Sequence, residues 1–388
     1  GEAAVSGVSL VDSFNVLMIQ LLSALATGGA VVASQYIGHR EPKRAKASAA
    51  QIMFIMISLS VVTAVIVAVG RHAILRGIFG SIDADVMRYA ETYFLLSALS
   101  YPFIGVYNAG AALFRAQGNS KISMLSSLVM NVVNIGGNAI LIYGFGMGVM
   151  GAATASLVSR MIACFTVMFL LQKPDCALRI DHLTDLKPDL DLIKRILKVG
   201  IPAGIENGMF QIGKLSVSSL TSTLGTAAIA ANAVANTTST FLNIPTSAVG
   251  LAVHTVVGQC LGAGRQDEAI YYIKKLSVIA EAVIIGCCAL VYILTRPVTM
   301  LGGMEPESAK MCFYMIGWIT VVKPIVWTLA FVPAYGMRAA GDVRFSMILS
   351  CISMWLFRVT LCIYLCRVHG FGPIAVWIGM FTDWTVRG

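Results

Sequence analysis

Seven ionisable side chains lie inside long apolar stretches of the sequence, where few polar neighbours surround them: Asp12, Glu206, Lys214, His254, Glu281, Lys323 and Arg358. A charge inside a membrane is costly unless it is paired or faces a water-lined cavity, and such residues commonly mark ion or substrate pathways. A carboxylate also changes its proton affinity when it loses solvent or gains a cationic neighbour. We therefore predict that Asp12, Glu206, Lys214 and Lys323 couple cation or proton binding to transport.

Glu206 is the strongest acidic candidate because it lies in a segment whose glycines and proline weaken a helix, KVGIPAGIENGMFQIGKLSV. Lys214 follows eight residues later, about 80° further round the same helix, so both side chains can face one cavity. The alternative is a permanent Glu206–Lys214 pair that only joins helices. Lys323 precedes Pro324, which suits a kinked helix, and its alternative role is that of a structural counter-ion.

Two stripes of small polar residues follow helical spacing. Asn131, Asn134 and Asn138 share one face of segment 120–143, and a second stripe lies in segment 225–257, formed by Asn232, Asn236, Thr240 and Asn243. Two such stripes favour a shared polar cavity. Amide side chains that hydrogen-bond between membrane helices are the alternative.

The remaining charges inside or near apolar stretches have simpler expected roles. Arg115, Arg160 and Asp383 lie closer to helix ends, where snorkelling or loop contacts explain them, and Arg358 is expected to pair with an acid or with backbone carbonyls. The sequence contains no HExxH, no GxGD-type acid pair and no Ser/His dyad at helical spacing, so we predict that the protein is not an enzyme. Its nine cysteines form no CxxC pair, and no metal site is predicted.

The elements that position these residues are membrane helices. Of the 388 residues, 57% are hydrophobic and only 12% are charged, whereas a soluble domain carries roughly a quarter charged residues. A bilayer crossing needs about 20 apolar residues, and no strand-like alternation occurs that would form a closed barrel. We predict an all-α polytopic membrane protein with eleven visible helices, at approximately 5–36, 46–70, 88–114, 120–143, 149–171, 194–222, 225–257, 268–294, 308–336, 342–366 and 371–388.

The basic residues predict the orientation of these helices. Eighteen Lys and Arg lie in one alternating set of loops and only six in the other set, namely Arg71, Arg76, Arg88, Arg296, Lys310 and Arg367. The positive-inside rule assigns the richer side to the cytoplasm, so the net charge of +9 needs no nucleic-acid partner. The first visible helix then runs inward, and an earlier helix is expected before Gly1.

The sequence repeats itself across a polar stretch. Gln35, Gly38 and Ala45 line up with Gln259, Gly262 and Ala269 at an offset of 224, and RAQGN at 115–119 lines up with RAAGD at 338–342. Equivalent segments share one orientation, which indicates parallel repeats related by an axis along the membrane normal. We predict an N-terminal lobe over 1–171, a cytoplasmic linker over 172–193 with a short surface helix at DLDLIKRIL, and a C-terminal lobe over 194–388 whose last helix is truncated.

The motifs LSALATGGAVVASQYIGHREPKRA and TSAVGLAVHTVVGQCLGAGRQDEA, with RAQGN, RAAGD and GVMGAA, resemble the multidrug and toxic compound extrusion (MATE) transporters. The resemblance covers the whole chain. It implies two six-helix lobes, of which helices two to eleven and part of helix twelve are present, and export of organic cations in exchange for H⁺ or Na⁺.

The resemblance also implies site residues, with departures. Phe210 and Trp327 stand where the family carries carboxylates in its second lobe, and Glu206 and Lys323 each fall one turn earlier. In the first lobe, Asn134 and Asn138 occupy positions where cation-binding members have Asn and then Asp. Other ligand positions of that site are matched by Asn108 and Ser156, and Asp12 is a candidate for the missing charge.

The predicted function is therefore a multidrug efflux antiporter that works by alternating access. The alternative is a flippase for lipid-linked polysaccharide or peptidoglycan precursors, which would use a cationic cavity containing Lys214, Lys323 and Arg358. We expect small organic cations or drugs as substrates and no cofactor besides the coupling ion. The predicted location is the plasma membrane, which is the inner membrane in a Gram-negative host, and the predicted state is a monomer.

Overall fold

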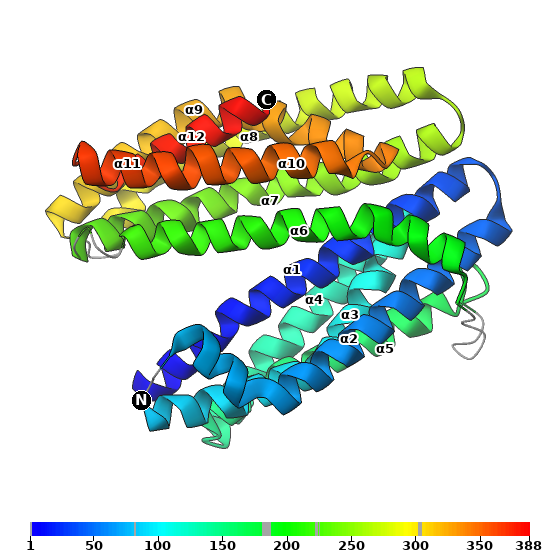
Figure 1. The fold of residues 1–388 in the computed structure, drawn as a ribbon, viewed down its shortest axis with the longest axis horizontal. Coiled ribbons are helices and arrows are strands. Elements are labelled where there is room, and N and C mark those ends of the chain that lie inside the picture. Colours follow the sequence, from blue (N-terminus) through cyan, green and yellow to red (C-terminus); the bar gives the residue numbers. More distant parts are fainter. Residues whose placement is uncertain (1, 81–82, 181–187, 222–223, 225, 302–304) are drawn as a thin grey trace. The chain divides into compact units, whose positions relative to one another are not determined.

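The computed structural model describes residues 2–80, 83–180, 188–221, 224, 226–301 and 305–388. In this described part the regular elements are all helical, which confirms the all-α prediction. Each of the eleven predicted segments corresponds to one continuous helical rod, and most of the rods extend a few residues beyond the predicted bounds (Figure 1). Two of these rods change to π-helix along their length, where α4 continues into η1 and where α10 continues through η4 into α11.

The first unit, Gly1–Asn207, contains five complete helices and the beginning of a sixth: α1 (Glu2–Gly38), α2 (Pro42–Phe79), α3 (Ala84–Ala116), α4 (Ser120–Asn138) with η1 (Ala139–Gly144), α5 (Gly148–Leu171) and the first half of α6 (Leu190–Thr221). Helix α3 packs against α1, α2 and α5 and is buried along most of its length. It approaches α5 closely at Gly110, where an added Cβ would lie 2.0 Å from Val167 Cγ1. Small residues allow membrane helices to come this near because backbone replaces side chain at the contact.

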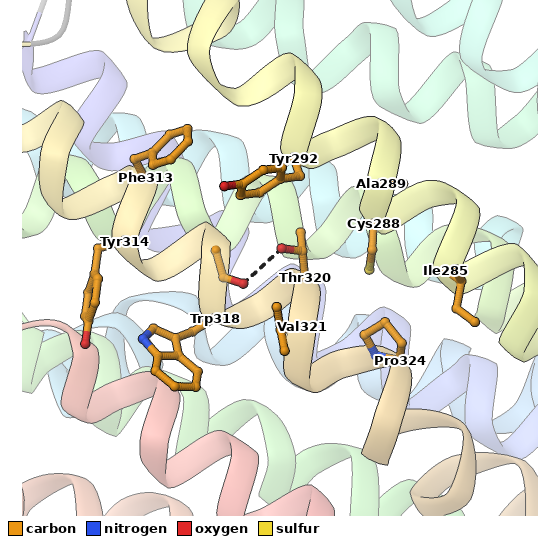
Figure 2. A pocket seen from close by; sticks show the side chains of 11 residues that line it. Ile285, Cys288, Ala289, Tyr292, Phe313, Tyr314, Trp318, Thr320, Val321 and Pro324 are labelled. Carbon is orange, nitrogen blue, oxygen red and sulfur yellow. Dashed lines mark hydrogen bonds between the residues drawn. The ribbon is translucent and has the colours of Figure 1, made fainter.

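The second unit, Gly208–Gly388, holds the rest of α6, together with α7 (Thr226–Gly262), α8 (Gln266–Leu301), α9 (Pro306–Ala340), α10 (Val343–Ser353), η4 (Met354–Thr360), α11 (Leu361–Val368) and α12 (Ile374–Arg387). Helices α7, α8 and α9 pack against one another, and α12 packs against α9 and η4. The core of this unit is rich in tryptophan, with Trp327, Trp377 and Trp384 all buried. Between α8 and α9 the surface forms a groove of about 710 Å³ (Figure 2).

The sequence repeat appears directly in the helix boundaries. Helices α1 and α7 both contain 37 residues, and they end at Gly38 and Gly262, which are 224 positions apart. Helices α3 and α9 end at Ala116 and Ala340, again 224 apart. The two π-helical segments lie in the corresponding rods of the two units, which begin at Ser120 and Val343. The repeat is therefore one of whole elements as well as of short motifs.

Helix α6 departs from the prediction for the region between the lobes. The expected separate surface helix at DLDLIKRIL is wrong, because α6 begins at Leu190 and continues without a break through Pro202 to Thr221. Residues 181–187 of the predicted linker lie outside the described part of the chain. The division between the two units falls within α6, between Asn207 and Gly208. The lobe boundaries at 171 and 194 stay a prediction.

Eight of the described helical rods are long and apolar enough to cross a membrane: α1, α2, α4 with η1, α5, α7, α8, α9 and α10 with η4 and α11. The other three rods, α3, α6 and α12, do not meet this criterion. Helix α12 has only 14 residues, and α3 and α6 carry several charges as well as an internal proline. These rods contain part of the polar chemistry described next.

Candidate functional site

Polar side chains of α1 and α3 meet inside unit 1. The Tyr93 hydroxyl donates to Asp12 Oδ1 over 2.9 Å, and the Tyr101 hydroxyl donates to Asn15 Oδ1 over 2.7 Å. Asn15 Nδ2 in turn donates to Ser97 Oγ over 3.1 Å. Tyr101 and Asn15 are buried, whereas Asp12 itself is exposed at the edge of the network. An accessible carboxylate is thus held by a buried tyrosine, and a separate buried hydrogen-bonded group lies on the same two helices.

Arg160 belongs to the same network. It donates to the Ser100 hydroxyl on α3, and its charge interacts with Asp12, Tyr93 and Tyr101. The expectation that Arg160 only snorkels or contacts a loop is therefore wrong. Arg115, for which the same was expected, does make a contact across the α3–α4 turn, where it donates to Ser123 over 2.8 Å.

The predicted first-lobe cavity residues are partly brought together. Asn134 donates to Ser156 over 3.1 Å, and Asn138 donates to Asn134 over 3.2 Å, so these three residues form a chain between α4 and α5. Within the described residues, Asn138 Oδ1 and Asn108 Nδ2 are buried without a hydrogen-bond partner. Asn131 is exposed on the same helix. The stripe thus joins helices, as the alternative proposed, and one unpartnered polar atom lies on the stripe at Asn138, with a second on α3 at Asn108.

Lys323 is the most deeply buried cation of unit 2, with no exposed surface. Its ammonium donates to Asn243 Oδ1 over 2.6 Å and to the Ser239 carbonyl over 3.2 Å, both on α7. The ammonium also lies 5.8 Å from the centre of the Trp384 ring. Among the described residues, the contacts of this ammonium are neutral oxygens and an aromatic face, so the desolvation of a buried charge is only partly offset.

The other predicted residues of the second stripe are more dispersed. Asn232 is buried, and its Oδ1 has no hydrogen-bond partner among the described residues. The Thr240 hydroxyl is exposed and donates to the Asn236 carbonyl within α7. In the described part of the chain, Asn243 is the member of this stripe that hydrogen-bonds to the buried ammonium of Lys323.

Glu206 and Lys214 occupy different environments on α6. Glu206 is buried in unit 1, whereas Lys214 is exposed in unit 2, where its charge interacts with that of Arg358. The guanidinium of Arg358 lies 5.0 Å from the centre of the Phe210 ring. Trp327 is buried and stacks on Phe331 with 4.6 Å between ring centres. The resemblance implied carboxylates at the positions of Phe210 and Trp327. Both positions instead carry aromatic rings that pack against a neighbouring side chain.

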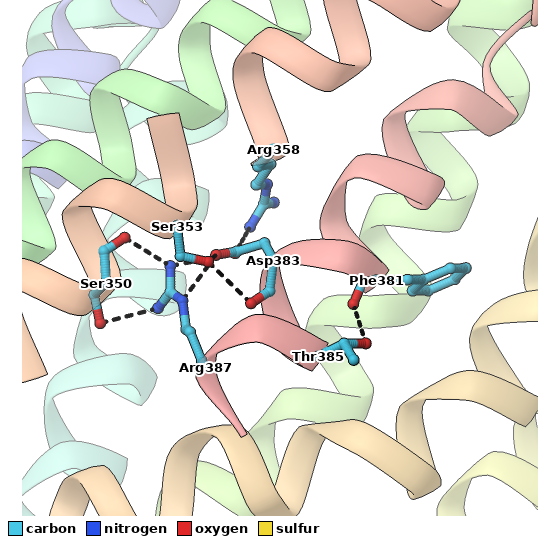
Figure 3. Close-up of polar contacts among 7 residues, drawn as sticks. All are labelled: Ser350, Ser353, Arg358, Phe381, Asp383, Thr385 and Arg387. Carbon is cyan, nitrogen blue, oxygen red and sulfur yellow. Dashed lines mark hydrogen bonds and ion pairs between the residues drawn. The ribbon is translucent and has the colours of Figure 1, made fainter. Parts of the chain in front are cut away.

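Asp383 forms a buried ion cluster that the sequence did not predict (Figure 3). Arg387 donates to Asp383 through Nε over 2.8 Å and through Nη2 over 3.2 Å, and the Ser353 hydroxyl donates to Asp383 Oδ1 over 2.5 Å. Arg358 Nη1 lies 4.0 Å from Asp383 Oδ2, which agrees with the expected role of Arg358 as the partner of an acid. Asp383 has no exposed surface, so the expected snorkelling or loop contact is wrong.

Asn15 lies on the same polar helix face as Asp12 in the sequence. Helical periodicity gave no sign of the other partners in these clusters, namely Tyr93, Tyr101, Ser97, Ser100, Ser350, Ser353 and Arg387. Tyrosine and serine are common in apolar helices and gave no distinct signal. The positive-inside rule places Arg387 among the eighteen basic residues predicted to face the cytoplasm, yet its side chain is only 5% exposed. A charged pair at i and i+4, Asp383 and Arg387, was the one available sign of this cluster.

Comparison with known proteins gives a consistent result. The family model MatE matches residues 1–140 and 202–364. The chain is 27% identical to the "Probable multidrug resistance protein YoeA" of Bacillus subtilis, over 98% of this chain and 82% of that protein. It is 23% identical to the "Probable multidrug resistance protein NorM" of Thermotoga maritima, over 98% of this chain and 82% of that protein.

Solved structures share the fold. A structure described as "Crystal structure of MATE in complex with MaL6" has a TM-score of 0.93 at 20% identity, covering all of this chain and 86% of the other. A second, "Outward-facing conformation of a multidrug resistance MATE family transporter of the MOP superfamily", also has a TM-score of 0.93 at 20% identity, with the same coverage of both chains. These matches do not favour the precursor flippase.

Proposed function

The chain belongs to the MatE family, and on that basis we propose that it is an antiporter that exports organic cations in exchange for H⁺ or Na⁺. As a member of this family it is a multi-pass transporter of the plasma membrane and not an enzyme. Relatives named as multidrug resistance proteins support small drugs as the substrates. We expect the protein to act as a monomer without an organic cofactor or resident metal.

The observation that carries the proposal is the position of Asp12. Its carboxylate lies eight residues inside the membrane span of α1 and is exposed, yet it is held by Tyr93. A carboxylate at this depth is costly against lipid, so a water-lined pathway is the environment that suits it. Such a carboxylate can take up H⁺ or Na⁺ from that pathway, and the cationic substrate competes for the same negative charge.

Lys323 supplies a second charged element that can respond to the transport cycle. Its ammonium joins α9 to α7 next to Pro324, where α9 lacks one backbone donor. A cycle that moves α9 relative to α7 would change the solvation of this charge. Lys323 therefore favours one arrangement of the two helices, and transport would depend on its release and recapture.

The test is transport by the purified protein in liposomes. Efflux of a fluorescent organic cation is measured under an imposed H⁺ gradient, under an imposed Na⁺ gradient and with no gradient. The proposal expects efflux that follows one of the two gradients, driven in part by a membrane potential worth about 2.3 kcal/mol per charge per 100 mV. Efflux that is indifferent to both gradients would refute antiport.

A variant links this test to the buried charge. Lys323→Met keeps an unbranched side chain one atom shorter and removes the ammonium. The fold is expected to persist because apolar replacement of buried charged groups is often neutral for stability. Gradient-driven efflux is expected to fall about tenfold, the effect of about 1.4 kcal/mol on the transport barrier. Lys274→Met, at an exposed lysine of α8, is the matched control and should transport normally.

A further inference from the structure

The groove between α8 and α9 lies on two helices that each cross the membrane. Its lining is apolar and aromatic, and several of the lining side chains are exposed, including Tyr292, Tyr314, Trp318 and Val321. The hydroxyl of Thr320 is used within its own helix, where it donates to the Ile316 carbonyl over 2.9 Å and to the Gly317 carbonyl over 3.0 Å. Figure 2 shows the second of these hydrogen bonds. The threonine hydroxyl is therefore already satisfied by the protein, and the groove presents a mainly apolar surface to a ligand.

The length of the groove matches one leaflet of a bilayer. Figure 2 shows aromatic residues toward one end and Ile285 and Pro324 toward the other. Along α9 the lining runs from Phe313 and Tyr314 to Pro324. The ten helical steps from Tyr314 to Pro324 rise about 15 Å at 1.5 Å per residue, and half of the hydrocarbon core is also about 15 Å. Tyr and Trp prefer the membrane interface, so the aromatic end is expected to lie at the headgroups.

Two basic residues stand at the aromatic end of the groove. The Arg296 guanidinium lies 5.2 Å from the centre of the Phe313 ring, which lines the groove, and Lys310 precedes Phe313 by one turn of α9. Both are exposed. They are two of only six basic residues on the side predicted to face outward. The phosphate of a lipid headgroup is the group that these two basic side chains would attract.

Acidic residues at the same end define the headgroup further. Glu305 and Glu307 lie at the start of α9, and both are exposed. Two bases and two acids leave the local charge balanced, which suits a headgroup with both a phosphate and an ammonium better than one with a net negative charge. We propose that the α8–α9 groove binds a zwitterionic phospholipid of the outer leaflet, with an acyl chain along the groove and the phosphate at Arg296 and Lys310.

The lipid would stabilise α9 close to its charged contact with α7. Pro324 lines the groove, and the preceding residue, Lys323, holds α7 through Asn243. An acyl chain packed against this turn buries apolar surface and favours the packed form. Added lipid should therefore raise the unfolding temperature, as any ligand does that binds the folded state alone.

The test is lipid binding to the delipidated, purified protein, followed by native mass spectrometry. Phosphatidylethanolamine and phosphatidylglycerol with identical acyl chains are compared. We expect phosphatidylethanolamine to bind and to raise the unfolding temperature, and phosphatidylglycerol to bind about tenfold less well, equivalent to about 1.4 kcal/mol. Equal or stronger binding of phosphatidylglycerol would overturn the zwitterionic assignment.

Filling the groove supplies a matched pair of variants. Gly317→Leu places a side chain in the lined space, and Gly286→Leu places the same side chain on α8 at a residue outside the lining. An added Cβ meets nothing within 4 Å at either glycine, so neither change clashes with the fold. Phosphatidylethanolamine occupancy should fall about tenfold in Gly317→Leu alone. Unchanged occupancy, or an equal fall in both variants, would overturn the proposed groove.

The headgroup is tested separately, with the double variant Arg296→Gln and Lys310→Gln. It should lose phosphatidylethanolamine binding, whereas Arg76→Gln with Arg367→Gln, at two other exposed outward-side bases, should keep it. A phosphatidylethanolamine with a diazirine in its acyl chain provides a readout on the unaltered protein. Labelled peptides should fall within 285–292 and 313–324, and labelling elsewhere alone would overturn the site. None of these measurements requires transport, so their outcome is independent of the proposed function.

Discussion

At the scale of single residues, two helical acids of this protein are held in different ways. Asp12 is accessible and is oriented by a buried tyrosine, whereas Asp383 is fully enclosed by Arg387, Ser353 and Arg358. An accessible carboxylate can exchange a cation with solvent, but an enclosed one must first break its ion pairs. These two acids are therefore expected to differ in what their removal does.

Asp12→Asn is expected to abolish gradient coupling and to leave the protein folded. The asparagine oxygen can still accept from Tyr93, so the network of unit 1 keeps its shape while the negative charge is lost. Efflux under the imposed gradient should fall to the rate seen without a gradient. Tyr93→Phe is the companion variant, which removes the hydrogen bond, keeps the charge and should retain coupling. Normal coupling in Asp12→Asn would remove this residue from the mechanism.

Asp383→Asn is expected to act on stability. Removing one partner from a buried ion pair leaves the other charge uncompensated, at a cost of about 3–5 kcal/mol. The unfolding temperature should therefore fall clearly. Adding Arg387→Met to this variant should recover part of the loss, because the stranded guanidinium is also removed, and a double-mutant cycle measures the coupling. Additive losses in the double variant would contradict the proposed ion pair.

At the scale of elements, the protein repeats a set of helices and the irregularities within them. Corresponding rods of both units contain π-helical segments, η1 and η4, and Arg358 of the buried ion cluster lies on η4. π-helical turns are rare in proteins, and those that occur are often found at functional sites. The close contacts between regular helices depend instead on glycine, as at Gly110 of α3 against Val167 of α5.

Gly110→Leu is expected to separate α3 from α5 and to destabilise unit 1. Even a Cβ at this position would overlap Val167, and overpacking of this kind costs about 1–3 kcal/mol. Thermal unfolding of the purified protein measures the loss. Gly136→Leu on α4 introduces the same side chain where a Cβ meets nothing within 4 Å, so its unfolding temperature should stay near that of the wild type.

At the scale of the whole molecule, orientation in the bilayer determines which ends of the helices meet the two solutions. The uneven distribution of basic residues predicts that the α1–α2 turn faces the cytoplasm and that the α2–α3 connection faces outward. Because Arg387 is buried, one basic residue fewer is exposed on the side predicted to be cytoplasmic, and that side still carries far more basic residues than the other. This orientation also places the α8–α9 groove in the outer leaflet.

Orientation can be measured with single cysteines and a maleimide that does not cross membranes. Lys43→Cys and Asp85→Cys place thiols at exposed positions on the two predicted sides, whereas the nine native cysteines are buried or half-buried, and the wild-type protein gives the background labelling. In right-side-out vesicles, the reagent should label Asp85→Cys at once and Lys43→Cys only after the membrane is permeabilised. The reverse pattern would invert the predicted topology.

The sequence by itself determined the helices and their order. A deficit of charge predicted membrane helices, because lipid requires each backbone donor to be satisfied within its own segment. The offset of 224 residues predicted a repetition that the ends of α1 and α7 reproduce. The family resemblance followed from motifs at the same spacing, and the matching family model confirmed it.

Tertiary structure alone decided which polar residues meet. Asp12 and Tyr93 are 81 positions apart, and Lys323 and Asn243 are 80 apart. Helical periodicity tells which side chains share a face of one helix, but the partner of that face depends on how side chains of different helices pack. For this reason the sequence identified Asp12 and Lys323 as candidates, whereas only the packed helices revealed the tyrosine, the amide and the buried ion cluster around Asp383.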